Sequence, residues 1–150
     1  MKNDKKPVVL LTNDDGYQAA GLRALADEFT DFAQVQIVAP SWERSGAAQS
    51  LTLRQPIVCH RIAENEWAID GTPADCVIVA LHKLLQSPPD LVISGINHGA
   101  NLGENVYYSG TVGAAREAVI HHVPGFAMSV RGQRCCALPC FETANTGGNS

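Results

Sequence analysis

The sequence predicts an α/β fold with a largely parallel sheet. Short continuous apolar runs recur along the chain, as in strands that are buried on both faces of a sheet. Between them stand segments whose apolar residues recur every three or four positions, as in helices that pack on a sheet. One pair of extended segments interrupts this alternation as a hairpin. Strands that alternate with helices join in parallel through crossover connections, and this defines the fold class.

The first third of the chain predicts two strands around one helix. Residues 7–12 (PVVLLT) form a continuous apolar run and predict a buried strand, and residues 13–21 form a loop. The apolar residues of 22–29 share one helical face and predict a helix. Residues 35–39 (VQIVA) predict the second strand, which a polar loop at 41–50 (SWERSGAAQS) follows.

The middle third predicts a hairpin and a helix. Residues 51–62 and 66–69 are extended segments around a short turn. Thr72 is a favoured N-cap residue, Pro73 suits the first helical position, and Asp75 suits the positive end of the helix dipole. We expect the helix that starts here to run until two consecutive prolines end it.

The last third continues the alternation of strands and helices up to residue 130, and the residues after it show no such pattern. Residues 91–94 (LVIS) predict a buried strand, 95–110 a glycine-punctuated loop, 111–122 a helix and 125–130 another strand. Residues 131–150 show no apolar periodicity. We expect neither a strand nor a helix in this atypical tail.

Composition limits the function classes. With 150 residues, 45% of them apolar and a formal net charge of −4, the chain fits one globular domain over 1–150 rather than a disordered chain or a fibre. A dedicated nucleic-acid binder would show a basic stripe, so we expect no nucleic-acid polymer as partner. No apolar run approaches the roughly 20 residues of a membrane span, so we expect no membrane association, signal peptide or anchor.

The cysteines and the missing motifs narrow the choice further. Five cysteines, an odd number, without an Asn-x-Ser/Thr acceptor predict the reducing cytoplasm. A zinc site from Cys135, Cys136 and Cys140 with His121 and His122 is a less favoured alternative to ordinary thiols, because the spacing is not Cys-x2-Cys. The sequence contains no P-loop, no GxGxxG and no GxSxG motif.

Polar loops follow three of the predicted strands: NDDG (13–16), RSG (44–46) and SGIN (94–97). In open α/β sheets, ligands bind beyond the carboxyl ends of the strands, so these loops converge if the strands are neighbours. The adjacent carboxylates of Asp14 and Asp15 are costly there unless a hard divalent cation neutralises them. The alternative is a solvated Asp-Asp-Gly turn.

The second candidate element is YYSGTVGAA (107–115), where small residues begin a helix. Exposed backbone N–H groups and the helix dipole favour an anion at such a place, and Ser109 and Thr111 add hydroxyl donors. This arrangement suits a phosphate group. The alternative is a capped helix that packs closely on the sheet through Gly113 and Ala114. A cation site beside a phosphate site predicts metal-assisted chemistry on a phosphoryl group.

At these residues the chain resembles the SurE family of stationary-phase survival nucleotidases. The matching stretches cover residues 8–130 nearly without a break and in family order: LLTNDDG (10–16), AAGLRAL (19–25), VAPSWERSGAAQSLTL (38–53), GTPADCV (71–77) and PDLVISGINHGANLGENVYYSGTVGAAREA (89–118).

The resemblance implies a three-layer α/β/α sandwich, Rossmann-like, that oligomerises as a dimer or tetramer. It implies a metal-dependent phosphatase that hydrolyses nucleoside 5′- and 3′-monophosphates, with one Mg²⁺ or Mn²⁺ per subunit. The metal ligands carried over by position are Asp14, Asp15, Ser45 and Asn97. The phosphate-facing residues are Asn101, Ser109, Gly110 and Thr111. The catalytic residues are then Asp14, Asp15, Asn101, Ser109 and Thr111.

Two alternatives stay beside the enzyme. Residues 141–144 (FETA) faintly resemble the start of the family's next helix, and the chain stops at Ser150, so the resemblance implies a copy shortened at its C-terminal end. A remnant that binds only a metal or a partner is therefore the first alternative. A phospho-receiver module is the second, disfavoured because Ser94 stands where its phosphorylated aspartate would follow the strand.

Overall fold

The computed structural model describes residues 5–99, 101, 103–132 and 134–140. Its strands form a seven-stranded sheet in the order β3-β4-β2-β1-β5-β6-β7. The strands are β1 (Val8–Thr12), β2 (Gln34–Pro40), β3 (Cys59–Ala63), β4 (Glu66–Ile69), β5 (Leu91–His98), β6 (Gly125–Arg131) and β7 (Arg134–Cys140). The helices are α1 (Ala20–Phe29), α2 (Pro73–Val79), α3 (Asn105–Tyr108) and α4 (Gly110–Ile120), and one π-helical turn (Ala80–Leu84) extends α2.

The interior of the sheet is parallel and its two edges are antiparallel. β4, β2, β1, β5 and β6 pair in parallel, while β3 pairs antiparallel to β4 and β7 antiparallel to β6. The predicted fold class and the predicted hairpin are therefore confirmed, although β3 begins only at Cys59 and the residues before it form a loop.

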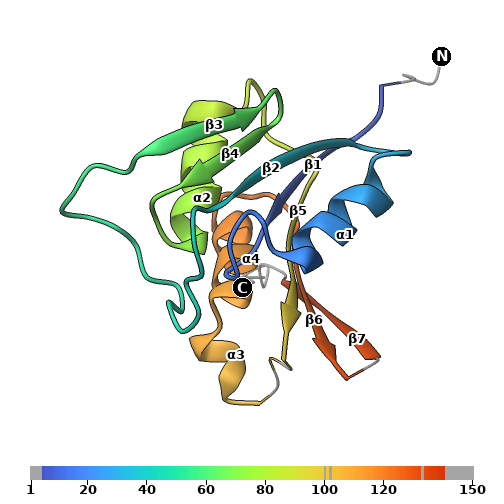
Figure 1. Ribbon diagram of the computed structural model, residues 1–150, viewed down its shortest axis with the longest axis vertical. Helices are drawn as coiled ribbons and strands as arrows, with labels where there is room; N and C mark the ends of the chain where they lie inside the picture. Colours follow the sequence, from blue (N-terminus) through green and yellow to red (C-terminus); the bar gives the residue numbers. More distant parts are fainter. Residues whose placement is uncertain (1–4, 100, 102, 133, 141–150) are drawn as a thin grey trace, which may run out of the picture.

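Helices cover both faces of the sheet, as Figure 1 shows. Successive side chains of β1 point to opposite faces, so Val9 and Leu11 pack with Leu22 of α1, whereas Leu10 packs with Cys76 of α2. Helix α4 lies beside α2 on that second face. The α/β/α sandwich is confirmed. No helix among the described residues combines the length and the apolar character that a bilayer crossing needs.

The start of α2 follows its sequence signals. The Thr72 hydroxyl accepts from the Asp75 backbone N–H at 3.1 Å, and the Asp75 carboxylate accepts from the Thr72 N–H at 2.9 Å. This reciprocal pair is a capping box, and Pro73 stands in the first turn as predicted.

Two predictions for the last third are wrong. The expected loop at 95–110 is shorter, because β5 continues to His98 and α3 occupies Asn105–Tyr108. The tail, expected to lack any strand, forms β7 over Arg134–Cys140. The strand is defined by backbone pairing with β6 along its whole length, from Gly125↔Cys140 to Arg131↔Arg134, and such long-range pairing is not encoded in the periodicity of the sequence. Gly132, with φ +61°, permits the tight turn between them. Residues 141–144 lie outside the described residues.

Candidate functional site

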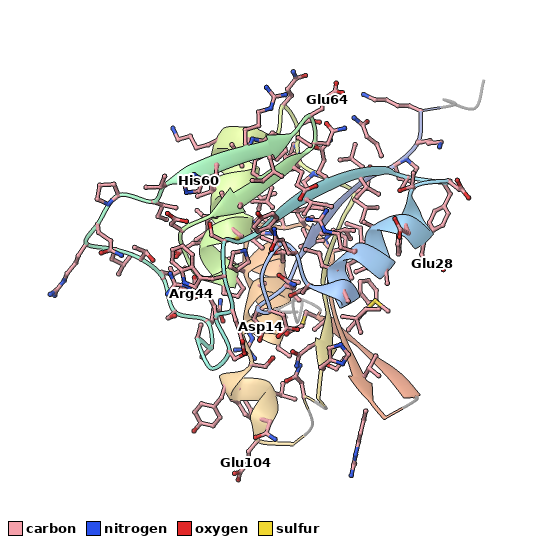
Figure 2. All side chains as sticks on the ribbon, viewed as in Figure 1. Asp14, Glu28, Arg44, His60, Glu64 and Glu104 are labelled. Carbon is pink, nitrogen blue, oxygen red and sulfur yellow. The ribbon has the colours of Figure 1, made fainter. Side chains whose placement is uncertain are left out.

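Two polar loops, after β1 and after β2, meet the polar C-terminal end of β5 at one end of the sheet, where β2, β1 and β5 lie side by side. They border a cavity of about 490 Å³. In Figure 2 Asp14 lies at this end, whereas Glu64 marks the β3–β4 turn at the opposite end. The cavity is lined mostly by polar residues: Asp14, Asp15, Glu43, Ser45, Gly46, Asn97, His98, Gly99, Asn101, Asn105, Tyr108 and Ser109.

The acidic turn after β1 is held by Asn13. Its buried side-chain amide donates to the Gly16 carbonyl at 2.8 Å, and its side-chain oxygen accepts from the Gly16 N–H at 3.2 Å. Gly16 has φ +102°, a conformation that favours glycine. The turn is therefore an ordered Asx-type structure rather than a loose solvated one, and it fixes the two aspartates between Asn13 and Gly16.

Asp14 is a buried carboxylate whose side-chain hydrogen-bond partner is Thr111. Only 4% of the residue is exposed, and its Oδ1 accepts from the Thr111 hydroxyl at 2.9 Å. Burial raises the pKa of Asp14, while the hydrogen bond from Thr111 acts in the opposite direction. The raised pKa means that the protein around this carboxylate does not compensate its charge, so a cation would stabilise it.

The negative charge of Asp15 is also uncompensated by the protein around it, and a single atom shows this directly. Its Oδ2 is buried and has no hydrogen-bond partner. Burial raises the pKa of Asp15, and the negative charges of Asp14 and Glu43 add to the effect. Buried polar atoms are nearly always satisfied, so an orphaned carboxylate oxygen that borders a cavity indicates a missing positive partner.

The loop after β2 supplies Ser45 from the side of α4. The backbone N–H of Arg44 donates to the Asp14 carbonyl at 2.6 Å, which ties this loop to the acidic turn. The Ser45 hydroxyl is exposed to the cavity and donates to Glu43 Oε1 at 2.7 Å. Glu43 was missed in the sequence, although it is the one acidic residue of the second polar loop.

Asn97 reaches the cavity because β5 is irregular at this point. The pairing of β5 with β6 shifts register between Ser94 and Asn97. The Asn97 amide nitrogen donates to the Gly99 carbonyl at 3.4 Å. A register shift near a site re-aims side chains, and Asn97 lines the same cavity as the two aspartates.

The predicted phosphate-facing residues divide into two groups. Asn101 and Ser109 line the cavity, and both are already bonded within the protein: the Asn101 amide to Ser129 Oγ at 2.7 Å, and Ser109 Oγ to the Val112 N–H at 3.2 Å. Thr111 is fully buried and does not line the cavity, because its hydroxyl is turned toward the Asp14 carboxylate. Ser129, on β6, carries no sequence signal that links it to the site.

Gly110 fits closely beneath the acidic turn. A Cβ atom on Gly110 would lie 3.1 Å from the Asp14 Cβ and 3.3 Å from its Oδ2. The absence of a side chain therefore allows the first turn of α4 to approach Asp14, where the Thr111 backbone N–H, like its hydroxyl, acts to lower the pKa of Asp14. Asn105 and Tyr108 line the cavity although no residue-type pattern selected them, and His98, which the sequence favours as a solvated loop histidine over a substrate contact, lines it too.

The donor set fits a hard divalent cation. The four predicted ligands, which are two carboxylates, a hydroxyl and an amide, all line one cavity, and one carboxylate oxygen is orphaned. Oxygen donors of this kind suit Mg²⁺ or Mn²⁺. Among the residues that the structure describes, no three His, Cys, Asp or Glu residues gather closely enough to hold a metal, so a cation here would need the hydroxyl and the amide beside the two aspartates. The side chains of Cys135 and Cys136 are not among those described.

Comparison with known proteins gives a consistent result. The family model described as "Survival protein SurE" matches residues 9–147. A relative named 5′-nucleotidase SurE from Geotalea daltonii is 52% identical over 122 residues, which are 81% of this chain and 49% of the relative. A relative of the same name from Vibrio parahaemolyticus is 53% identical over 133 residues, which are 88% of this chain and 52% of the relative.

A solved structure shares the fold. The crystal structure of the SurE protein from Aquifex aeolicus aligns with a TM-score of 0.81 and 43% sequence identity, covering 85% of this chain and 52% of that one. The chain spans about half the length of the curated relatives that it matches.

Proposed function

Since the chain belongs to the SurE family, we propose that the cavity at the end of β1, β2 and β5 is the active site of a divalent-metal-dependent phosphatase, one that hydrolyses nucleoside 5′- and 3′-monophosphates to nucleoside and phosphate. The relatives named 5′-nucleotidase SurE support the reaction. The observation that carries the proposal is the orphaned, buried Oδ2 of Asp15 beside a second buried carboxylate in a polar cavity.

Four residues would hold one Mg²⁺ or Mn²⁺: Asp14, Asp15, Ser45 and Asn97. The bound cation supplies Lewis-acid polarisation of the phosphoryl group and charge stabilisation. Thr111 keeps Asp14 oriented and ionised through its hydroxyl, and Asn13 holds the turn that presents both aspartates. These contacts restrict the carboxylates to one arrangement before any ligand arrives.

The phosphate binds on the α4 side of the cavity in this proposal. Ser109 lines that side with a hydroxyl, and Asn101, held by Ser129 of β6, lines the same cavity with an amide. The positive end of the α4 dipole, at Gly110, adds electrostatic stabilisation of the phosphate. Their role is to orient the phosphoryl group and to balance the charge that develops on it.

The test is a phosphatase assay on the full chain with nucleoside 5′- and 3′-monophosphates, with and without Mn²⁺ and with EDTA. We expect inorganic phosphate to be released only with the metal. Manganese binding without turnover would identify the alternative that only binds metal, and the absence of both would refute the proposal. The proposal also includes a cytoplasmic homo-oligomer, and sedimentation at several concentrations would measure its state.

A further inference from the structure

Helix α4 contains a buried acid that the proposed chemistry does not use. Glu117 is only 5% exposed and does not line the cavity. Its Oε2 accepts from the Gln49 amide at 2.9 Å, and its Oε1 lies 3.2 Å from His121 Nε2. Burying a carboxylate is costly unless hydrogen bonds compensate it, so the partners of Glu117 indicate which part of the structure it stabilises.

The main partner comes from the loop that carries Ser45. Gln49 lies four residues after Ser45 and only three after Gly46, both of which line the cavity. Both polar atoms of the Gln49 amide are hydrogen-bonded to α4: Nε2 donates to Glu117, and Oε1 accepts from Arg116 at 3.4 Å. The side-chain amide therefore links the loop to two consecutive residues of one helix.

The backbone shows the same attachment independently. A Cβ atom on Gly113 of α4 would lie 2.6 Å from the Ala48 carbonyl oxygen, so the loop rests directly on the helix. Ala48 has φ +50°, a left-handed conformation that is rare for a residue with a side chain. Such a conformation persists only where surrounding contacts hold it, and Gln49 provides one next to it.

The same helix positions the acidic pair. Thr111, at the start of α4, bonds Asp14, and Glu117 stands six residues further on, about 9 Å along the helix. Helix α4 thus contacts both the acidic turn after β1, through Thr111, and the loop after β2, through Glu117.

We propose that Gln49 and Glu117 are positioning residues for the cation site, and that their hydrogen bond sets the place of Ser45 relative to Asp14 and Asp15. The inference rests on the proposed function, because it assumes that Ser45 is a ligand. Contacts that orient metal ligands typically contribute 10- to 100-fold to metal affinity. The pair therefore controls affinity without touching the cation.

The test is calorimetric titration of the full chain with Mn²⁺ alone. We expect Gln49→Leu to weaken Mn²⁺ binding by about tenfold. The exchanged pair Gln49→Glu with Glu117→Gln keeps one carboxylate and one amide, and should recover most of the affinity. Gly113→Ala displaces the loop by a different route and should also weaken binding.

The matched control is Gln36→Leu. Gln36 is a buried glutamine whose amide nitrogen donates to Asn65 Oδ1 at 3.3 Å, and, unlike the half-buried Gln49, it lies at the opposite end of the sheet. It should lower the melting temperature about as much as Gln49→Leu and leave Mn²⁺ affinity unchanged.

The outcomes separate the two proposals. Wild-type affinity in both Gln49→Leu and Gly113→Ala would overturn the positioning role and leave the proposed function standing. Failure of the exchanged pair to recover any affinity would also count against the hydrogen bond as the cause. A wild-type chain that binds no Mn²⁺ would refute the proposed function itself, and the positioning role with it.

Discussion

Replacing Asp14 by Asn should stabilise the metal-free protein while abolishing its affinity for a divalent cation. Burial raises the pKa of Asp14, so the folded state binds a proton at this carboxyl more tightly than the unfolded state does. Between the unfolded pKa of about 3.9 and the higher folded pKa, the free energy of unfolding therefore falls as pH rises. Above the folded pKa the full penalty persists.

The magnitude follows from linkage and from the contacts of the side chain. Each unit by which the pKa is raised costs about 1.4 kcal/mol of stability at neutral pH. An amide at position 14 avoids this cost and keeps the Oδ1 that accepts from Thr111. The gain is offset in part because the new NH₂ group must be hydrated in the cavity. We expect a net gain of about 1 kcal/mol, which is about 2–4 °C in melting temperature for a chain of this size.

The assay is thermal unfolding in EDTA between pH 5 and pH 8, followed by Mn²⁺ titration. The advantage of Asp14→Asn should grow with pH until the folded pKa of Asp14 is passed and stay constant above it. Its Mn²⁺ affinity should fall by about 100-fold or more, since a charged ligand is lost. Asp31→Asn, at an exposed position, is the control and should change neither property. A variant that melts below wild type at pH 8 and binds Mn²⁺ normally would refute both the burial penalty and the metal assignment.

Three further perturbations test other contacts. Ser109→Ala should weaken inhibition by inorganic phosphate by about tenfold, measured by steady-state kinetics. Thr111→Val should instead raise the pH needed for Mn²⁺ binding in calorimetry, because the lost hydroxyl donates to the Asp14 carboxylate. The same phosphate inhibition and the same pH dependence of Mn²⁺ binding in both variants would contradict this division of roles. Asp75→Ala removes the acceptor of three hydrogen bonds, from the Thr52 N–H, the Thr52 hydroxyl and the Thr72 N–H, and should lower the free energy of unfolding in urea by about 3 kcal/mol. A loss under about 1 kcal/mol would show that these bonds are dispensable. The pKa of Asp70 is lowered by hydrogen bonds, first of all the one that the Ser41 hydroxyl donates to it. The ionised Asp70 therefore stabilises the fold above about pH 4, and this stabilisation is lost as pH falls through the folded pKa. Ser41→Ala should be less stable than wild type at pH 7 and equal to it near pH 2, and a difference that survives in acid would exclude the carboxylate as its source.

The strands and the start of α2 were predictable because local chemistry decides them. A run such as VVLLT cannot be exposed on either face, so it must be an inner strand, and Thr72 with Asp75 caps a helix without help from the rest of the fold. The strand exits were also predictable as one site. Parallel neighbours end at the same edge of a sheet, so adjacency in space followed from the topology.

Long-range pairing decides what the sequence did not show. Strand β7 exists because β6 offers an unpaired edge, and only Gly132 indicated the turn. The direction of the Thr111 hydroxyl depends on how closely Gly110 lets α4 approach Asp14, which no spacing along the chain encodes. Gln49 and Glu117 are 68 positions apart and belong to no recognisable pattern.

The hydrogen bond between Asp14 and Thr111 joins residues 97 positions apart, and this has a consequence for the order of folding. Strand β1 meets β2 after one helix, but it must wait for β5, some 80 residues later, before its second edge is paired. Contacts of such separation form late because closing a long loop is entropically unfavourable. Until then both aspartates remain hydrated and keep ordinary acidities. The step that docks α4 is therefore the one that removes them from water, and a divalent cation present at that moment should speed the final stage of folding rather than collapse of the chain.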